Sequence, residues 1–212
     1  MVMNRSSSLI MSPFDQAKLL DKHQVFTIQG RDKHGRNILC VIGKFFPARF
    51  VSVEVLNKYL EDKIFAELGD MPFTVVYVHT GVQRCQNFPG MSALRSIYDA
   101  IPTNVKDNLG AVYFVHPGVQ TRLFFATVGR FLFSGGLYSK LKYVNRVEFL
   151  WNHVKKNEME IPDFVYDYDE ELENRPMMDY GLESDHPRVY GGRGSSPWVD
   201  SPVSMYSMRC IA

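Results

Sequence analysis

The sequence lacks the short motifs that mark common catalytic and metal sites. It contains no GxSxG nucleophile elbow, no P-loop and no HExxH metal motif. Its three cysteines, Cys40, Cys85 and Cys210, are widely spaced and form no CxxC pair. This spacing argues against a zinc site and a disulfide framework, and it fits a reducing compartment. We therefore expect a protein that is not an enzyme, with no catalytic residues, no metal and no cofactor.

The chain also lacks a strong net charge and a long apolar run. Its 24 Lys and Arg residues nearly balance 23 Asp and Glu residues, for a formal net charge of +1, so no global field favours a nucleic acid partner. No apolar run approaches the length of a membrane span, and the first residues contain no signal-peptide core. Myristoylation needs glycine where the chain has Val2, and Cys210 lies one position too close to the end for prenylation. These features predict a cytoplasmic protein, or one that is peripheral at a membrane.

The composition and length predict one folded domain with tails. Hydrophobic residues make up 45% of the 212 residues and aromatic residues 13%, which is typical of a globular protein slightly rich in aromatics. From Arg175 onward the apolar periodicity stops, and glycine, serine and proline become frequent. We predict a flexible N-terminus over 1–12, a folded domain over 13–174 and a disordered Gly/Ser/Pro-rich tail over 175–212.

The folded part alternates between strand and helix patterns. Ser12-Pro13 predicts a helix start, and the turn GRDKHGR between two β-rich runs predicts a hairpin. We expect strands at 25–28, 37–42, 73–78, 111–115 and 141–144, and helices at 13–23, 52–68, 91–101, 120–134 and 147–154. Strand, helix and strand in repeated succession after a hairpin predict an α/β fold. Its sheet would be mostly parallel, with helices packed on it.

Several segments in this order resemble a known family. They are GRDKHGRNILCVIG, FTVVYVHTG, IPTNVKDNLGAVYFVHPG, KLKYV and IPDFV. Together the stretch 25–167 resembles a CRAL-TRIO domain, the lipid-binding fold of phosphatidylinositol-transfer proteins. It is most similar to the divergent branch that includes BCH domains and ganglioside-induced differentiation-associated proteins. The resemblance implies a non-catalytic fold that binds a hydrophobic lipid or phospholipid.

The aromatic helix at 120–134 is the first candidate site. It is apolar around well over half its circumference, so it is either an ordinary core helix or a wall that faces lipid. The resemblance favours the wall, because it makes this segment a gate helix over a pocket whose floor is formed by two strands. The predicted lipid-binding residues are Val76, Val78, Val112 and Phe114 on the floor, and Phe124, Val128, Phe131 and Leu132 on the gate helix.

Basic residues flank the aromatic helix. Arg122, Arg130, Lys140 and Lys142 lie on either side of its apolar core in the sequence. Basic side chains around an apolar surface suit docking to an anionic membrane. A solvated rim without a partner is the alternative, and the sequence leaves both open.

Three functions compete at this point. The first is non-enzymatic lipid binding, in lipid transfer or lipid sensing, under the aromatic gate helix. The second is a protein-interaction scaffold of BCH type, which would bind small GTPases or itself and no lipid. The third is a hydrolase that uses His79 or His116, each at the end of an apolar strand. Because no nucleophile motif accompanies these histidines, we expect them to make hydrogen bonds at the strand ends instead.

Overall fold

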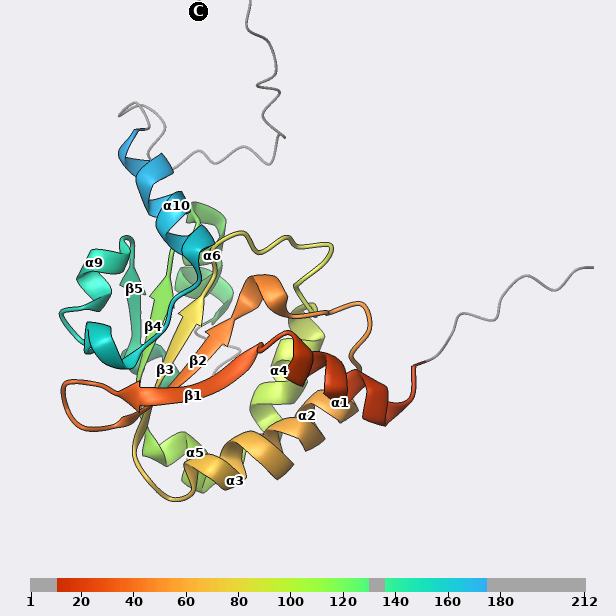
Figure 1. Cartoon of the computed structure of the whole chain (residues 1–212). Helices are drawn as coiled ribbons and strands as arrows, with labels where there is room; N and C mark the ends of the chain where they lie inside the picture. Colours follow the sequence, from red (N-terminus) through yellow and green to blue (C-terminus); the bar gives the residue numbers. More distant parts are fainter. Residues whose placement is uncertain (1–10, 130–135, 175–212) are drawn as a thin grey trace, which may run out of the picture.

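A five-stranded sheet forms the centre of the molecule (Figure 1). The computed structural model describes residues 11–129 and 136–174. The strands are β1 (Phe26–Arg31), β2 (Asn37–Ile42), β3 (Phe73–Val78), β4 (Leu109–Val115) and β5 (Leu141–Val144). They lie in the order β1-β2-β3-β4-β5; the first pair is antiparallel and the other three pairs are parallel. The predicted α/β fold with an N-terminal hairpin and a mostly parallel sheet is confirmed.

Each of the five predicted helices begins within one residue of its predicted start. The Ser12 hydroxyl accepts a hydrogen bond from the amide of Asp15, and Ser52 caps the next helix in the same way through Val55. The helical segments before β4 are α1 (Pro13–Lys22), η1 (Gly43–Phe45), α2 (Val53–Tyr59), η2 (Leu60–Phe65), α3 (Ala66–Leu68), α4 (Met91–Ala100) and α5 (Thr103–Asn108). After β4 come α6 (Val119–Phe124), η3 (Phe125–Gly129), α8 (Leu137–Lys140), α9 (Val147–Leu150), η4 (Lys156–Glu158) and α10 (Asp163–Glu173).

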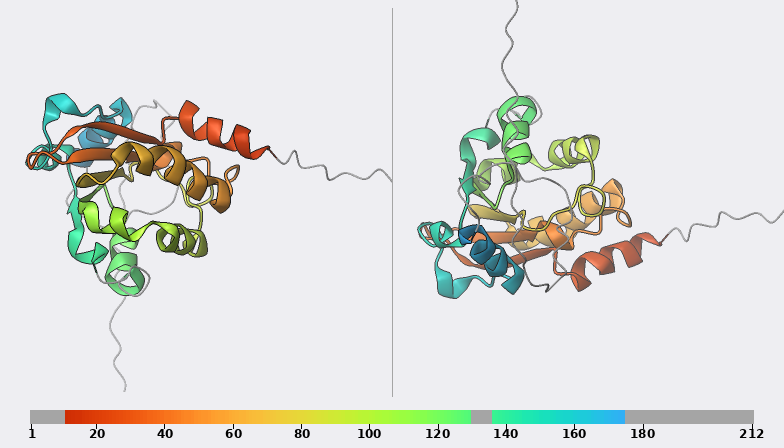
Figure 2. Two further views of the ribbon diagram at one scale, coloured as in Figure 1. Left: turned by 90° about the horizontal axis from the view of Figure 1, so that it is seen from below. Right: turned by 90° about the horizontal axis from the view of Figure 1, so that it is seen from above.

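Helices cover both faces of the sheet. In the left view of Figure 2, α9 and α10 lie on one side, and the green helices α4, α5 and α6 lie on the other. Side chains of β2 to β5 form one buried cluster with α9, α10 and the segment between them. A second cluster joins β2 and β3 to α1, α2, η2, α3 and α5. The continuous apolar run of β3 is explained by this double coverage, because both faces of the strand are buried.

A buried carboxylate holds the hairpin turn against β3. Asp32 is fully buried and accepts hydrogen bonds from the amides of His34 and Arg36, at 2.8 and 2.9 Å. The Arg36 guanidinium and the Thr74 hydroxyl also donate to it, at 2.7 and 2.8 Å. Burial alone would raise the pKa of Asp32, but these donors outweigh burial and lower it. This contact fixes the hairpin to the parallel sheet, and no local sequence signal predicts it.

Several helical segments were not predicted from the sequence. Among them are α5, over 103–108, and α10, which closes one face of the sheet. Residues 1–10 and 175–212 lie outside the described residues, so the predicted domain boundaries stay predictions. Within the described part of the chain, no helix is both long enough and apolar enough to cross a bilayer.

Candidate ligand cavity

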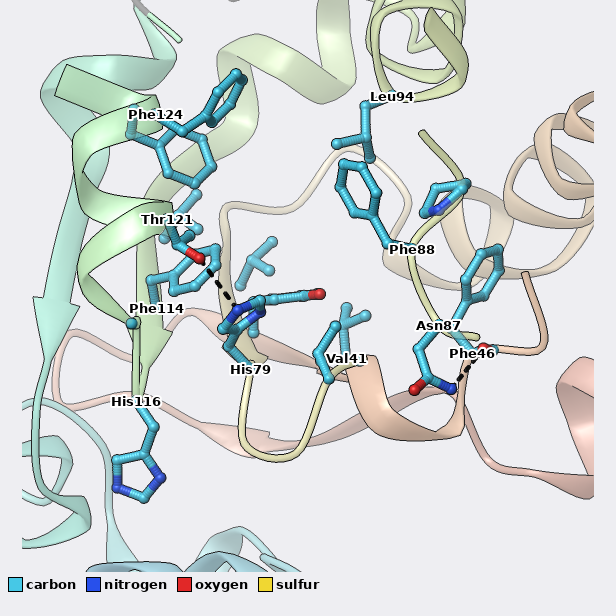
Figure 3. A pocket seen from close by; sticks show the side chains of 18 of the residues that line it. Val41, Phe46, His79, Asn87, Phe88, Leu94, Phe114, His116, Thr121 and Phe124 are labelled. Carbon is cyan, nitrogen blue, oxygen red and sulfur yellow. Dashed lines mark hydrogen bonds between the residues drawn. The ribbon is translucent and has the colours of Figure 1, made fainter. Parts of the chain in front are cut away.

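A cavity of about 1030 Å³ lies over one face of the sheet. Figure 3 shows Phe114 and Phe124 on one side of it, Leu94 and Phe88 on the other, and His79 between them. The walls come from α4, α6 and the loop that follows β3, and most of the lining side chains are apolar or aromatic. This volume is at the upper end of the range for small-molecule sites in proteins.

Alternate strand residues form the cavity floor. Val75 and Tyr77 of β3 line the cavity together with Val112 and Phe114 of β4. The predicted floor residues Val76 and Val78 do not line it. Both are 0% exposed and belong to the cluster on the opposite face, with α9 and α10.

The reason for this correction is the period of a strand, in which neighbouring side chains point to opposite faces. The even-numbered positions of β3 therefore belong to one face and the odd-numbered positions to the other. In β4, Val112 and Phe114 lie on the cavity side.

Aromatic rings in tilted and edge-to-face contact connect the floor to the predicted gate helix. The ring of Phe114 lies 4.8 Å from that of Tyr77 and 5.5 Å from that of Phe125, measured between centroids. Phe125 in turn contacts Phe124 at 5.4 Å. Each such pair stabilises the fold by about 0.5–1.5 kcal/mol in addition to the effect of burying its surface. They attach α6 to the sheet through ring contacts.

One apolar side chain of α6 points away from the cavity. Phe124 and the partly exposed Val119 line the cavity, whereas Leu123 is 62% exposed and does not line it. This helix therefore has apolar side chains at the cavity and one in the solvent. Phe131 and Leu132, and the side chain of Val128, lie outside the described residues.

A polar contact links α6 to the end of β3. The Nε2 atom of His79 and the Thr121 hydroxyl share a hydrogen bond of 3.2 Å, drawn as a dashed line in Figure 3. Tyr77 lies nearby, and burial raises the pKa of its phenol to about 12, so the hydroxyl is neutral at physiological pH. Its oxygen would be 2.6 Å from a Cβ at residue 43, which explains why Gly43 stands there.

His116 joins the sheet to α10. Its Nδ1 atom lies 2.7 Å from the Thr80 hydroxyl, and its Nε2 atom lies 2.7 Å from Asp169. The other carboxylate oxygen of Asp169 accepts a hydrogen bond from the amide of Val147. Both ring nitrogens are engaged, and the backbone of His116 is left-handed, with φ of 53°. The arrangement holds β3, β4, α9 and α10 together at one end of the cavity.

The predicted basic rim is not assembled as one surface. Arg122 donates to the Pro117 carbonyl and to the Asn145 side chain, and Lys140 donates to the Lys106 carbonyl. Lys142 lies over the ring of Tyr113, which belongs to the buried cluster on the face opposite the cavity. Arg130 lies outside the described residues. The described members of the set are therefore dispersed: Arg122 lies in α6, Lys140 ends α8, and Lys142 pairs with Tyr113 in the sheet.

Several parts of the cavity wall were missed from the sequence, among them the loop after β3 and α4. The loop after β3 contributes Phe88 and Pro89, and α4 contributes Met91, Leu94 and Ile97. The apolar stripe of α4 was visible at helical spacing, but nothing local said that it faces a cavity rather than the core. In the ranges 11–129 and 136–174, no three His, Cys, Asp or Glu side chains lie close enough to hold a metal ion.

Comparison with known proteins identifies the fold. The family described as "Divergent CRAL/TRIO domain" matches residues 35–171. Ganglioside-induced differentiation-associated protein 2 of Xenopus tropicalis is 33% identical over 155 residues, which are 70% of this chain and 29% of that protein. The protein named GDAP2 homolog of Drosophila melanogaster is 30% identical over 140 residues, 66% of this chain and 25% of its own length.

The chain thus matches only between a quarter and three tenths of the length of these two relatives. The family match covers β2, β3, β4, α6, β5 and most of α10, so it includes both strands of the cavity floor, whereas β1 lies before it. The resemblance drawn from the sequence is confirmed: this chain belongs to the divergent CRAL/TRIO domain family.

Proposed function

We propose that this domain binds a hydrophobic lipid or a phospholipid in the cavity over β3 and β4. The observation that carries the proposal is the cavity itself, which has about 1030 Å³ of space and an aromatic and aliphatic lining. CRAL/TRIO domains typically bind lipids and are generally non-catalytic. Lining of this kind would supply affinity by apolar burial, at about 25 cal/mol for each Å² removed from water. No chemical step is required.

In this proposal α6 acts as the gate. Phe124 of α6 and the adjoining Phe125 of η3 would cover the ligand, and the exposed Leu123 would enter a membrane surface when the ligand is exchanged. A helix with apolar side chains at the cavity and in the solvent loses little by moving from the cavity mouth to a lipid interface. Transfer or sensing of lipid at a membrane would follow from this exchange, with only peripheral contact to the membrane.

The test is native mass spectrometry of the full chain purified without detergent, followed by organic extraction and lipid analysis. A stoichiometric lipid adduct supports the proposal and names the ligand class. An apo mass that stays unchanged after incubation with mixed liposomes contradicts it. In that case the scaffold hypothesis would take its place, and the search would move to protein partners, including a second copy of the chain.

A further inference from the structure

The charge of the cavity lining is one-sided. Arg84 is the sole Lys or Arg among the described residues that line the cavity, and no Asp or Glu lines it. Arg84 belongs to the loop that runs from the end of β3 toward α4. An apolar cavity with one cation at its border is chemically asymmetric, because only one part of its wall favours negative charge.

The Arg84 guanidinium has no partner within the described part of the protein. It is exposed, and its side chain makes no ion pair or hydrogen bond with any described residue. Nearby basic side chains differ in this respect. Arg49 donates to the Cys85 carbonyl at 2.8 Å, and Lys44 lies 4.1 Å from the ring centroid of Phe164. Arg84 is therefore the cation that remains available to a ligand in the cavity.

A second group of lining residues is wholly apolar. It comprises Leu56 and Leu60 from the α2–η2 segment, together with Val25, Phe26 and Ile97. Hydrocarbon is the ligand chemistry that suits this part, because a polar group placed there would lose its hydration without a replacement. The cavity thus matches a molecule with an apolar body and one polar end.

The cavity volume limits how much of the ligand's apolar part can be enclosed. At about 30 Å³ for each nonhydrogen atom, a water molecule's share of liquid volume, the cavity of about 1030 Å³ holds roughly 34 atoms. One or two hydrocarbon chains fit within this limit. A complete diacyl phospholipid, with about 50 nonhydrogen atoms, would need about 1500 Å³ by the same measure. The head group of such a lipid would have to lie at the cavity border, where Arg84 is.

We infer that the ligand is an anionic amphiphile, with its hydrocarbon in the cavity and its carboxylate or phosphate at Arg84. The inference rests on the proposed function and adds the charge of the head group. A fatty acid and an anionic phospholipid share this chemistry. The loop that carries Arg84 then acts as the head-group site, separate from the α6 gate on the other side of the floor.

The test compares acids with matching neutral lipids on the delipidated full chain at pH 8. Displacement of Nile red measures the affinity of oleic acid against oleyl alcohol, and of dioleoyl phosphatidic acid against dioleoylglycerol. We expect the anionic member of at least one pair to bind about three- to fivefold more tightly, as for one partly exposed ion pair. The pair that shows the larger preference identifies the source of the anion.

Variants assign the preference to Arg84. Arg84→Gln should remove it and leave the affinity for the neutral lipid within about twofold, whereas Arg84→Lys should retain most of it. Arg95→Gln is the matched control, because Arg95 pairs with Asp99 on α4 and does not line the cavity. Equal binding of acid and neutral lipid, or a preference that survives Arg84→Gln, overturns the inference and leaves lipid binding intact. If none of the four lipids displaces the probe, the proposed function fails as well.

Discussion

The two faces of the sheet have opposite properties although they are built from the same strands. On the face toward α9 and α10, side chains such as Val76, Val115 and Leu150 are fully buried and fill the space. On the other face, Val75 and Val112 border a cavity of about 1030 Å³ and are only partly buried. Neighbouring residues of one strand therefore serve different purposes.

Substitutions on the filled face should therefore affect stability, and those on the cavity face should affect ligand binding. On the filled face, a change in side-chain volume lowers the free energy of unfolding, because interiors are packed as densely as organic crystals. A face with a cavity has room for a larger side chain, and it loses ligand space instead. The predictions below use this contrast, beginning with the largest expected effect.

The same substitution at adjacent residues should have opposite consequences. Val76→Trp forces a large ring into the filled face, and we expect it to lower the free energy of unfolding by more than about 3 kcal/mol. Val75→Trp places the ring in the cavity, where it should remove lipid binding and change the free energy of unfolding by less than about 1 kcal/mol. Urea denaturation and native mass spectrometry measure the two effects.

Equal destabilisation by both variants would contradict the assignment of Val75 to the cavity. Retained lipid in a folded Val75→Trp protein would contradict the position of the ligand.

Asp32→Asn should give the next largest loss in the free energy of unfolding. It weakens the hydrogen bonds from Arg36 and Thr74 at the edge of the filled face, at a cost of about 2–3 kcal/mol. Because the pKa of Asp32 is lowered in the folded state, its contribution is present above its ordinary value of 3.8 and disappears as the pH falls through the folded pKa. Urea denaturation between pH 7 and pH 2 should show the two proteins converging in stability as the pH falls.

The control for this experiment is Asp62→Asn, at an exposed position in η2. It should leave the unfolding free energy within about 0.5 kcal/mol at every pH. A gap between wild type and Asp32→Asn that stays constant across this pH range would show that the carboxylate charge does not matter.

Asp169→Asn tests the connection between the two faces through His116. The change weakens the bond to His116 Nε2 and to the Val147 amide, and we expect a loss of about 1–2 kcal/mol. Hydrogen exchange should rise first in α10, because this contact holds the helix on the sheet. Glu170→Gln, which changes an exposed neighbour, should not alter exchange. Equal exchange in the two variants would refute the role of Asp169.

Leu123→Ser should have the smallest effect on stability and still affect membrane contact. The side chain is 62% exposed, so the unfolding free energy should change by less than about 0.5 kcal/mol. Vesicle affinity should fall about three- to tenfold, as expected for the lost burial of one leucine in the interface. Met71→Ser, at a similarly exposed residue before β3, is the control and should leave binding unchanged. A drop of equal size in both would indicate nonspecific adsorption.

The sequence predicted the bounds of helices and strands better than the tertiary contacts between them. Strands 73–78 and 141–144 were predicted at their observed bounds, and the caps at Ser12 and Ser52 were found, because these signals are local. The buried position of Asp32 was missed, since its donors Arg36 and Thr74 meet only in the folded chain. The unassigned helix α5 is short, with a single buried residue, Val105, and therefore carries little periodic signal.

The cavity was anticipated through the family resemblance, but its residues were only partly identified. Phe114, Val112 and Phe124 line it, whereas Val76 and Val78 lie on the other face. Alternation of polar and apolar residues normally tells the two faces of a strand apart, and it is absent here because both faces are covered. The composition of β3 therefore gave no means to choose between its odd-numbered and even-numbered positions.

The sequence by itself determined the order of strands and helices, the hairpin, the family and the apolar character of α6, because local periodicity and short segments carry this information. Only the tertiary structure decided which face of the sheet is filled, which encloses the cavity, and that Arg84 borders it without a described partner. These outcomes depend on how α4, α6 and α10 pack across the sheet, and such packing joins residues far apart in the chain. Local sequence patterns carry no information on which of these distant residues pack together.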